Sequence, residues 1–172
     1  MSKKLKRFIP NKYKESVYEI DFFALYEQGF RLAFIDIDNT LANYKTELPT
    51  KENLELVDEI QKIGFEVILI SNNYFKRVSK FSEPFGVPFV HWALKPLKRG
   101  YKKGLKKASR EYKKEEVITV GDQLITDVKG SSKMGFYSIL VKPIEKKTDV
   151  FTTKINRCRE QRILKKIKKK YP

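Results

Sequence analysis

Four aspartates of this chain occupy positions where carboxylates can act together. Asp36 and Asp38 are two residues apart, so their side chains project to the same side of an extended backbone. Asp122 and Asp127 follow later, five residues apart. Crowded carboxylates repel one another, and a bound divalent cation relieves that repulsion. Because no histidine or cysteine cluster accompanies these oxygens, the residue types favour magnesium.

Ser71 and Lys95 add a hydroxyl and an amine to the same candidate site. They can supply hydrogen bonds and positive charge to phosphoryl oxygens, over which charge spreads in the transition state of phosphoryl transfer. One aspartate can attack phosphorus and form an aspartyl-phosphate. A second can protonate the leaving oxygen and then deprotonate the attacking water. This set of residue types therefore indicates a phosphatase.

Most of these candidate residues end or follow an apolar run that is typical of a buried strand. Repeated alternation of strands and helices predicts an α/β fold, a Rossmann-like parallel sheet with helices on both faces. In such a sheet, ligands bind beyond the carboxyl ends of the strands, so the candidate residues should gather at one edge. The expected strands are 31–36, 65–70, 87–90, 117–120 and 136–141, and the expected helices are 50–64, 74–83, 100–114 and 126–134.

The helix expected at 50–64 has recognisable ends. Thr50 is a candidate N-cap and Gly64 a natural stop. Asn73 can cap the helix at 74–83 in the same way. The buried face of the first helix should carry Leu54, Val57 and Ile60 or Gln61.

The order of the candidate residues resembles the four-motif pattern of the haloacid-dehalogenase (HAD) superfamily. The sequence DxDxT begins at Asp36, a serine follows the next strand at Ser71, and a lysine follows at Lys95. GDxxxxD then begins at Gly121. The resemblance implies that Asp36 is the nucleophile and Asp38 the general acid/base.

The same resemblance implies ligands for phosphate and for a cofactor, Mg²⁺. The implied residues are Ser71, Asn72 and Lys95 for phosphate, Asp36, Asp122 and the backbone carbonyl of Ile37 for Mg²⁺, and Thr40 and Asp127 as supporting positions.

A closer resemblance covers nearly the whole chain. The segments FIPNKY, DIDNTLA, ISNN, FSEPFGVPFV, KP, GDQLITDV and ILVKP resemble the YqeG-type, IIIA-class phosphatases, which are similar to the eukaryotic phosphatidylglycerophosphatases. The segments 38–50 and 73–95 are too short to hold a cap domain. We therefore expect an open site, which suits a phosphate on something large, such as a lipid, a nucleic-acid end or a protein.

Basic residues are concentrated at the two ends of the chain. Its net charge is +16, and segments 1–14 and 154–172 together hold 15 Lys/Arg and a single acidic residue. The segment 98–114 is also basic, so the rest of the body is net acidic. Basic ends suit docking to a polyanion, either anionic lipid or nucleic acid, and they equally suit a solvated surface.

We expect one HAD-like domain over 1–172. Its catalytic core would span about 30–142, with a basic N-terminal segment at 1–28 and a basic helical segment at 151–171. That last helix either packs on the domain or lies on an anionic membrane. The single cysteine, Cys158, and the lack of a signal sequence or membrane-spanning run suggest the cytoplasm, with the protein peripheral to the inner face of the membrane.

Three functions stay open on sequence alone. The first is a phosphatase for a lipid phosphomonoester such as phosphatidylglycerophosphate. The second is a phosphatase for a soluble nucleotide or sugar phosphate. The third is a nucleic-acid- or ribosome-associated binding protein, which no RNA-binding motif supports. The oligomeric state is also open. Residues given a packing role instead are His91, Cys158, Phe75, Phe81, Phe85, Phe89 and Trp92.

Overall fold

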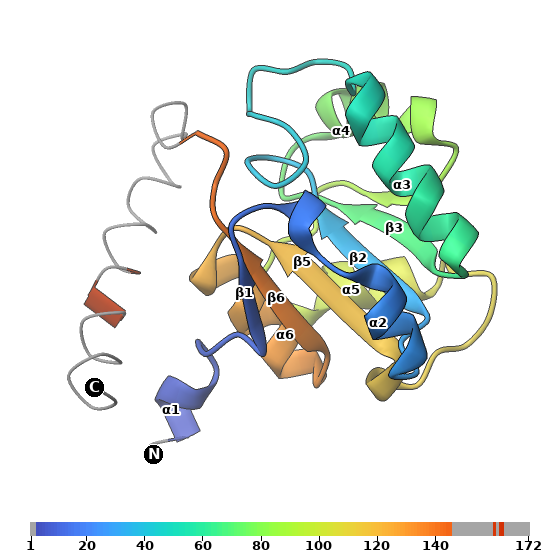
Figure 1. The fold of residues 1–172 in the computed structure, drawn as a ribbon. Helices are drawn as coiled ribbons and strands as arrows, with labels where there is room; N and C mark the ends of the chain where they lie inside the picture. Colours follow the sequence, from blue (N-terminus) through green and yellow to red (C-terminus); the bar gives the residue numbers. More distant parts are fainter. Residues whose placement is uncertain (1–2, 146–159, 161, 164–172) are drawn as a thin grey trace.

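The protein folds around one parallel sheet. The computed structural model describes residues 3–145, 160, 162 and 163, and in this part of the chain six strands pair in the order β1-β6-β5-β2-β3-β4 (Figure 1). All five neighbouring pairs are parallel. The strands are β1 (Lys12–Lys14), β2 (Leu32–Asp36), β3 (Glu66–Ile70), β4 (Phe89–Val90), β5 (Val117–Gly121) and β6 (Tyr137–Val141).

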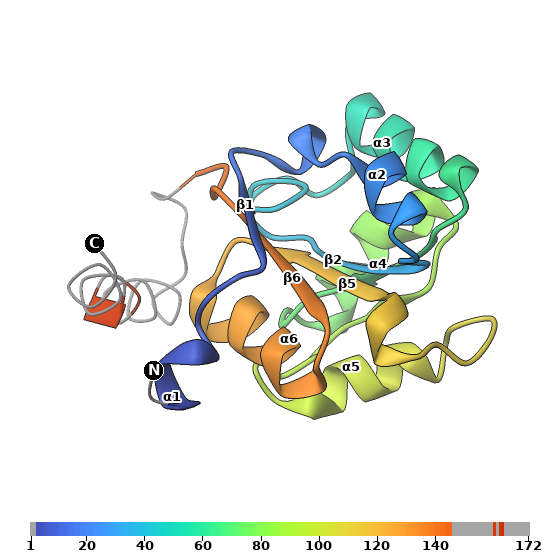
Figure 2. The ribbon, with the colours of Figure 1, turned by 60° about the horizontal axis from the view of Figure 1, so that its bottom comes forward.

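Helices cover both faces of this sheet, which confirms the predicted fold class. Helices α2 and α3 lie on one face, and α5 and α6 lie on the other (Figure 2). The described helices are α1 (Lys3–Lys6), α2 (Phe22–Glu27), α3 (Lys51–Ile63), α4 (Phe75–Ser82), α5 (Lys98–Leu105) and α6 (Lys129–Met134). Short 3₁₀ turns are η1 (Val17–Glu19), η2 (Glu83–Phe85) and η3 (Lys114–Glu116), and η4 (Leu124–Val128) is a π-helical turn.

The central strands are buried on both faces. In β2, Ala33 and Ile35 pack with α2, α3 and α4, whereas Leu32 and Phe34 pack with α5. Alternate residues therefore enter opposite cores, as the two-residue repeat of a strand requires. Burial of this kind explains why the strand reads as an apolar run in the sequence.

The N-terminal segment contributes the edge strand of the sheet. Strand β1 pairs with β6, and Asn11 next to it exchanges hydrogen bonds with the backbone of Ser138 at 2.9 Å in both directions. The sequence patterns placed the core at 30–142 and gave no sign of β1 or α2. The sheet in fact begins at Lys12.

Helix α3 has the predicted ends. Thr50 caps it through a capping box with Asn53, and Gly64 ends it at φ +117°. Val57 and Ile60 are buried as expected, whereas Leu54 is only half-buried and Leu56 is buried instead. The side chain of Asn53 also donates to the carbonyl oxygen of Leu41 at 2.9 Å, which fastens the helix to the loop after β2.

Helix α5 ends at Leu105, and the predicted helix at 100–114 was therefore too long. The carboxylate of Glu66 binds the segment that follows Leu105. It accepts hydrogen bonds from the backbone and hydroxyl of Ser109 and from the hydroxyl of Tyr112. These bonds compete with continuation of the helix. The helix packs closely on the sheet through Gly104, where an added Cβ would lie 2.3 Å from the Phe34 ring.

Three further expectations need correction. Strand β4 holds two residues, not four, and α4 begins after Tyr74 as N-cap, one residue beyond Asn73. Phe81 is fully buried as expected. Phe75 and Trp92 are 56% and 54% exposed and so are not core residues, although the Phe75 ring lies 6.2 Å from the ring of Phe89 in β4.

The segments 146–159, 161 and 164–172 lie outside the described residues. The prediction of a basic helix at 151–171 and the packing role of Cys158 fall mostly or wholly there. Glu160 is one of the described residues near the C-terminal end, and its carboxylate accepts a hydrogen bond from the backbone N–H of Ile125 at 2.9 Å. Among the residues described, no helix has both the length and the apolar character needed to cross a bilayer.

Candidate active site

The carboxyl ends of β5, β2 and β3 lie side by side and deliver the predicted residues to one edge of the sheet. Asp36 is the last residue of β2, Ser71 follows β3 and Asp122 follows β5. Lys95 arrives from the loop between β4 and α5. The edge predicted from the sequence is thus the place where these side chains meet.

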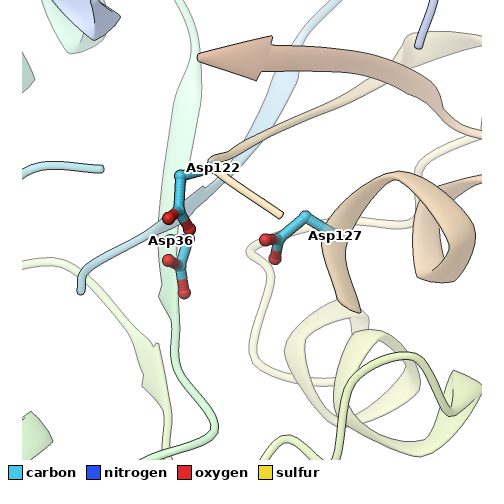
Figure 3. Close-up of side chains that lie close together, drawn as sticks. All are labelled: Asp36, Asp122 and Asp127. Carbon is cyan, nitrogen blue, oxygen red and sulfur yellow. The ribbon is translucent and has the colours of Figure 1, made fainter. Parts of the chain in front are cut away.

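Three buried carboxylates form a cluster at this edge. Oxygens of Asp36, Asp122 and Asp127 all lie within 4.8 Å of one another, and the three residues are at most 6% exposed. Figure 3 shows the three side chains converging from separate segments of the chain. The sequence pattern gave Asp127 only a supporting position, whereas the structure places its carboxylate within the cluster itself.

Lys95 is the cation that faces two of these carboxylates. Its Nζ lies 2.5 Å from Asp36 Oδ1 and 2.6 Å from Asp127 Oδ1, and it also donates to the carbonyl oxygen of Ile70 at 3.4 Å. Burial acts to lower the pKa of Lys95, but the attraction of Asp127 and Asp36 outweighs it and raises the pKa above its usual value. The amine therefore stays charged.

The surroundings that favour the charged form of Lys95 disfavour the charged form of Asp36. Burial raises the pKa of its carboxyl well above the usual range, and Asp127, Asp122 and Asp38 add to this rise against the attraction of Lys95. One ammonium group does not compensate three carboxylates in a buried site. A further cation at this place would favour the ionised form of Asp36.

The turn η4 holds Asp127 in place. Asp127 Oδ2 accepts hydrogen bonds from the backbone of Gln123 and the hydroxyl of Thr126, both at 3.1 Å. Gly121 makes room for it, because a Cβ there would lie 2.3 Å from Asp127 Cγ. The glycine of the GDxxxxD segment thus permits the carboxylate to approach the strand end.

Asp38 lies outside the carboxylate cluster and has its own partners. Its Oδ2 accepts a hydrogen bond from the hydroxyl of Ser71 at 3.0 Å, and its Oδ1 lies 3.1 Å from Arg77 Nη2. The Arg77 side chain is about 10% exposed. Among the described residues, its Nε and Nη1 are buried with no hydrogen-bond partner. Arg77 was not among the predicted site residues, because an arginine within a helix carries no local signal of such a role.

Thr40 and Ile37 belong to the turn that follows Asp36. Thr40 Oγ1 donates to Asp36 Oδ2 at 3.4 Å, consistent with a supporting position. The carbonyl oxygen of Ile37 instead accepts backbone hydrogen bonds from Thr40, Leu41 and Ala42 at 3.0 to 3.3 Å. Its lone pairs are used inside the turn, and we therefore withdraw Ile37 as a metal ligand.

Asn72 holds the backbone around Lys95. Its side-chain amide donates to the Lys95 carbonyl at 3.1 Å, and its Oδ1 accepts from the Lys95 backbone N–H at 2.7 Å. The amide oxygen and one of the two side-chain N–H groups of Asn72 are engaged in this way, so Asn72 positions Lys95, and its role as a phosphate ligand stays a prediction. Ser71, by contrast, keeps a hydroxyl at the edge of the site, between Asp38 and the backbone N–H of Asn73.

The carboxylate cluster has the chemistry of a magnesium site. Its donors are oxygens, and its charge is only partly balanced by Lys95. Hard oxygen donors around a small space are what Mg²⁺ selects, with water and substrate phosphate filling the remaining positions. The residues present therefore fit Mg²⁺, and Asp36, Asp122 and Asp127 would hold it.

Solved structures share this fold. A protein of Listeria monocytogenes serotype 4b, reported as uncharacterized, superposes with a TM-score of 0.53 at 14% identity, over 68% of this chain and 84% of that one. The HAD-hydrolase YfnB of Bacillus subtilis superposes with a TM-score of 0.50 at 12% identity, over 70% of this chain and 92% of that one. These likenesses, at 14% and 12% identity, show the fold, which the chain shares with a protein reported as a HAD-hydrolase.

The sequence comparisons show which family the chain belongs to and, with it, that the protein is a phosphatase of the HAD type. Residues 1–145 match the family described as mitochondrial PGP phosphatase. The chain is also 36% identical over 165 residues to the Bacillus subtilis protein named "Probable phosphatase YqeG", a match that covers 96% of this chain and 94% of that protein. The chain belongs to the mitochondrial PGP phosphatase family, as its resemblance to YqeG-type phosphatases led us to expect.

Proposed function

We propose that the protein is a magnesium-dependent phosphomonoester hydrolase that works through a phosphoryl group carried on Asp36. The observation that supports this most is the cluster itself, in which the Asp36 carboxylate lies beside Asp122, Asp127 and the charged Lys95. Bound Mg²⁺ would supply positive charge to the phosphate and keep Asp36 ionised. The crystal structure of YfnB holds magnesium, and this property of a protein with the same fold agrees with the assignment.

The reaction then has two steps on this chain. One Asp36 oxygen attacks phosphorus, the bond from phosphorus to the leaving oxygen breaks, and Asp38 gives its proton to that oxygen. Asp38, now ionised, takes a proton from water, which attacks the aspartyl-phosphate and releases inorganic phosphate. Lys95 and Ser71 would donate to the phosphoryl oxygens in both steps.

Arg77 and Asn72 would position the residues that react. Arg77 holds the side chain of Asp38 at 3.1 Å, and Asn72 holds the backbone of Lys95 at 2.7 and 3.1 Å. Reactive groups held within small tolerances are what makes such a site effective. Neither residue need touch the phosphate to matter for the rate.

For the substrate we propose a lipid phosphomonoester of the phosphatidylglycerophosphate type. Two observations support this choice: the matching family is described as a PGP phosphatase, and neither 39–50 nor 73–95 contains a cap domain among the described residues. A site without a cap is open to a head group presented by a large assembly. A soluble sugar or nucleotide phosphate would gain little from such an open rim.

A substrate panel tests this proposal. Purified protein with Mg²⁺ would be given phosphatidylglycerophosphate in anionic vesicles, a set of nucleotide and sugar phosphates, and p-nitrophenyl phosphate. We expect kcat/KM for the lipid to exceed that for every soluble substrate by at least 100-fold. A soluble phosphate turned over as efficiently as the lipid would overturn the substrate class and leave the phosphatase chemistry standing.

A further inference from the structure

The loop that carries Lys95 turns apolar side chains outward on both sides of it. Trp92, Leu94 and Leu97 are 54%, 42% and 52% exposed, whereas Lys95 between them is 6% exposed. Trp92 and Leu94 have φ values of +44° and +54°, a left-handed conformation that bulky residues rarely adopt. Such strain persists mainly where function requires it. The loop therefore holds large apolar groups in solvent at an energetic cost.

A second segment extends this exposed surface. Tyr74 and Phe75, at the start of α4, are 48% and 56% exposed. They lie beside the first segment, because the backbone N–H of Trp92 donates to the Asn73 carbonyl at 2.9 Å and the Phe75 ring lies 5.1 Å from the ring of His91. We call the five side chains Tyr74, Phe75, Trp92, Leu94 and Leu97 the apolar rim.

A basic cavity adjoins the apolar rim. It measures about 500 Å³ and is lined by Arg7, Leu97, Lys98, Ser132 and Lys133, with no acidic residue among the lining residues. Leu97 belongs both to this cavity and to the rim, and Lys133 Nζ donates to the Pro96 carbonyl at 3.0 Å. The basic cavity and the apolar rim are therefore parts of one surface around the Lys95 loop.

The positive charges around the basic cavity repel one another. Arg7, Lys98 and Lys133 line it together, and no carboxylate is among the lining residues to balance their charges. Lys76 and Arg99 are exposed in the same two rim segments. An anionic group placed in the cavity would relieve this repulsion. The surface thus combines exposed apolar side chains with a place for negative charge.

We propose that the apolar rim and the basic cavity form a docking surface for an anionic lipid bilayer, with the rim in the interfacial layer and the cavity around a lipid phosphate head group. Aromatic side chains flanked by lysine and arginine are typical of surfaces that lie in such an interface. Leu94 and Leu97 have no flat face on which a nucleic-acid base could stack, so a bilayer suits the rim better than RNA. The inference rests on the proposed lipid substrate and extends it to the membrane that presents it.

The fluorescence of Trp92 tests the docking directly, because it is the only tryptophan of the chain. Wild-type protein would be titrated with vesicles of phosphatidylglycerol and phosphatidylcholine, which contain no phosphomonoester, and with vesicles of phosphatidylcholine alone. We expect a blue shift and quenching by shallow brominated lipid with the anionic vesicles, and at least tenfold weaker binding to the neutral ones.

Matched variants separate the rim from other apolar and basic groups. Leu94→Ser/Leu97→Ser should weaken binding to anionic vesicles about tenfold or more. Phe23→Ser removes a side chain that is 64% exposed on α2, outside both rim segments, and should change binding less than twofold. Arg7→Glu/Lys133→Glu should abolish the preference for anionic lipid. Circular dichroism and the melting temperature would show that each variant is folded.

Two outcomes would overturn the docking surface. One is binding to vesicles, measured by sedimentation, with unchanged Trp92 emission, which would place the contact elsewhere on the chain. The other is a Trp92 response to single-stranded RNA with none to vesicles. A Trp92 blue shift on anionic vesicles without hydrolysis of any lipid phosphate would support docking and overturn only the lipid substrate.

Discussion

Arg77 and Asp38 form an ion pair at the edge of the site, with 3.1 Å between Arg77 Nη2 and Asp38 Oδ1. The two side chains are 10% and 19% exposed, so the pair is largely shielded from water. It joins α4 to the loop after β2, 39 residues apart in the chain. Arg77 therefore fixes the position of the Asp38 carboxylate, which is the proposed general acid/base.

Arg77→Gln should lower kcat about 10- to 100-fold with little change in KM, because Asp38 would lose the group that orients it. Arg77→Lys should recover part of the rate. Steady-state kinetics on single and double variants check this. If Arg77 acts through Asp38, Arg77→Gln/Asp38→Asn will be no slower than Asp38→Asn alone. If the rate loss of the double variant instead equals the product of the losses in the two single variants, Arg77 acts independently of Asp38.

Mg²⁺ should stabilise the fold as well as activate the enzyme. At a concentration 100-fold above its dissociation constant, a bound ion adds about 2.7 kcal/mol, or a rise in melting temperature on the order of 5–10 °C for a chain of this size. EDTA should remove both this rise and the activity. Asp122→Asn should lose most of the Mg²⁺-dependent rise in a thermal melt. An equal rise in this variant would argue that the ion binds elsewhere.

Gly121→Ala should disturb the site by displacing one carboxylate. The new Cβ would meet Asp127 Cγ at 2.3 Å, a distance that cannot persist without movement. We expect a loss of about 1–3 kcal/mol in the free energy of unfolding and weaker Mg²⁺ binding. Denaturant unfolding and Mg²⁺ titration measure the two effects. The alanine variant binding Mg²⁺ as tightly as wild type would mean that Asp127 is not a ligand.

Asn53→Ala should destabilise the fold without touching the reacting groups. It removes the capping interaction with Thr50 and the hydrogen bond to the Leu41 carbonyl oxygen, which would then be buried without this donor. The expected loss is about 1–3 kcal/mol in the free energy of unfolding. Urea unfolding measures it. Thr46→Ala serves as the milder control, because it loses one partly buried hydrogen bond to Asn43 in the loop between β2 and α3.

The positions of the charged site residues could be predicted because strand ends are visible in a sequence. Asp36 ends one apolar run and Asp122 follows another, and parallel strands align their carboxyl ends. Spacing alone did not show that the Asp127 carboxylate joins the cluster, since this depends on the π-helical turn and on the space left by Gly121.

Other features escaped prediction because they depend on contacts between distant segments. The side chain of Asn72 binds a backbone 23 residues away, and strand β1 is a short, polar segment whose partner β6 lies at the far end of the domain. The end of α5 is set by Glu66, which belongs to another strand. In each case the local sequence is compatible with several structures, and tertiary hydrogen bonds select one.

The most direct test of the proposed chemistry is to trap the phosphorylated enzyme. Protein quenched with acid during turnover, with Asp38→Asn used to slow the second step, would be digested and mapped by mass spectrometry. We expect a hydroxylamine-sensitive phosphoryl group on the peptide containing Asp36, with no label and at least about 10⁴-fold lower turnover in Asp36→Asn. Label on another residue, or near wild-type turnover by Asp36→Asn, would contradict it.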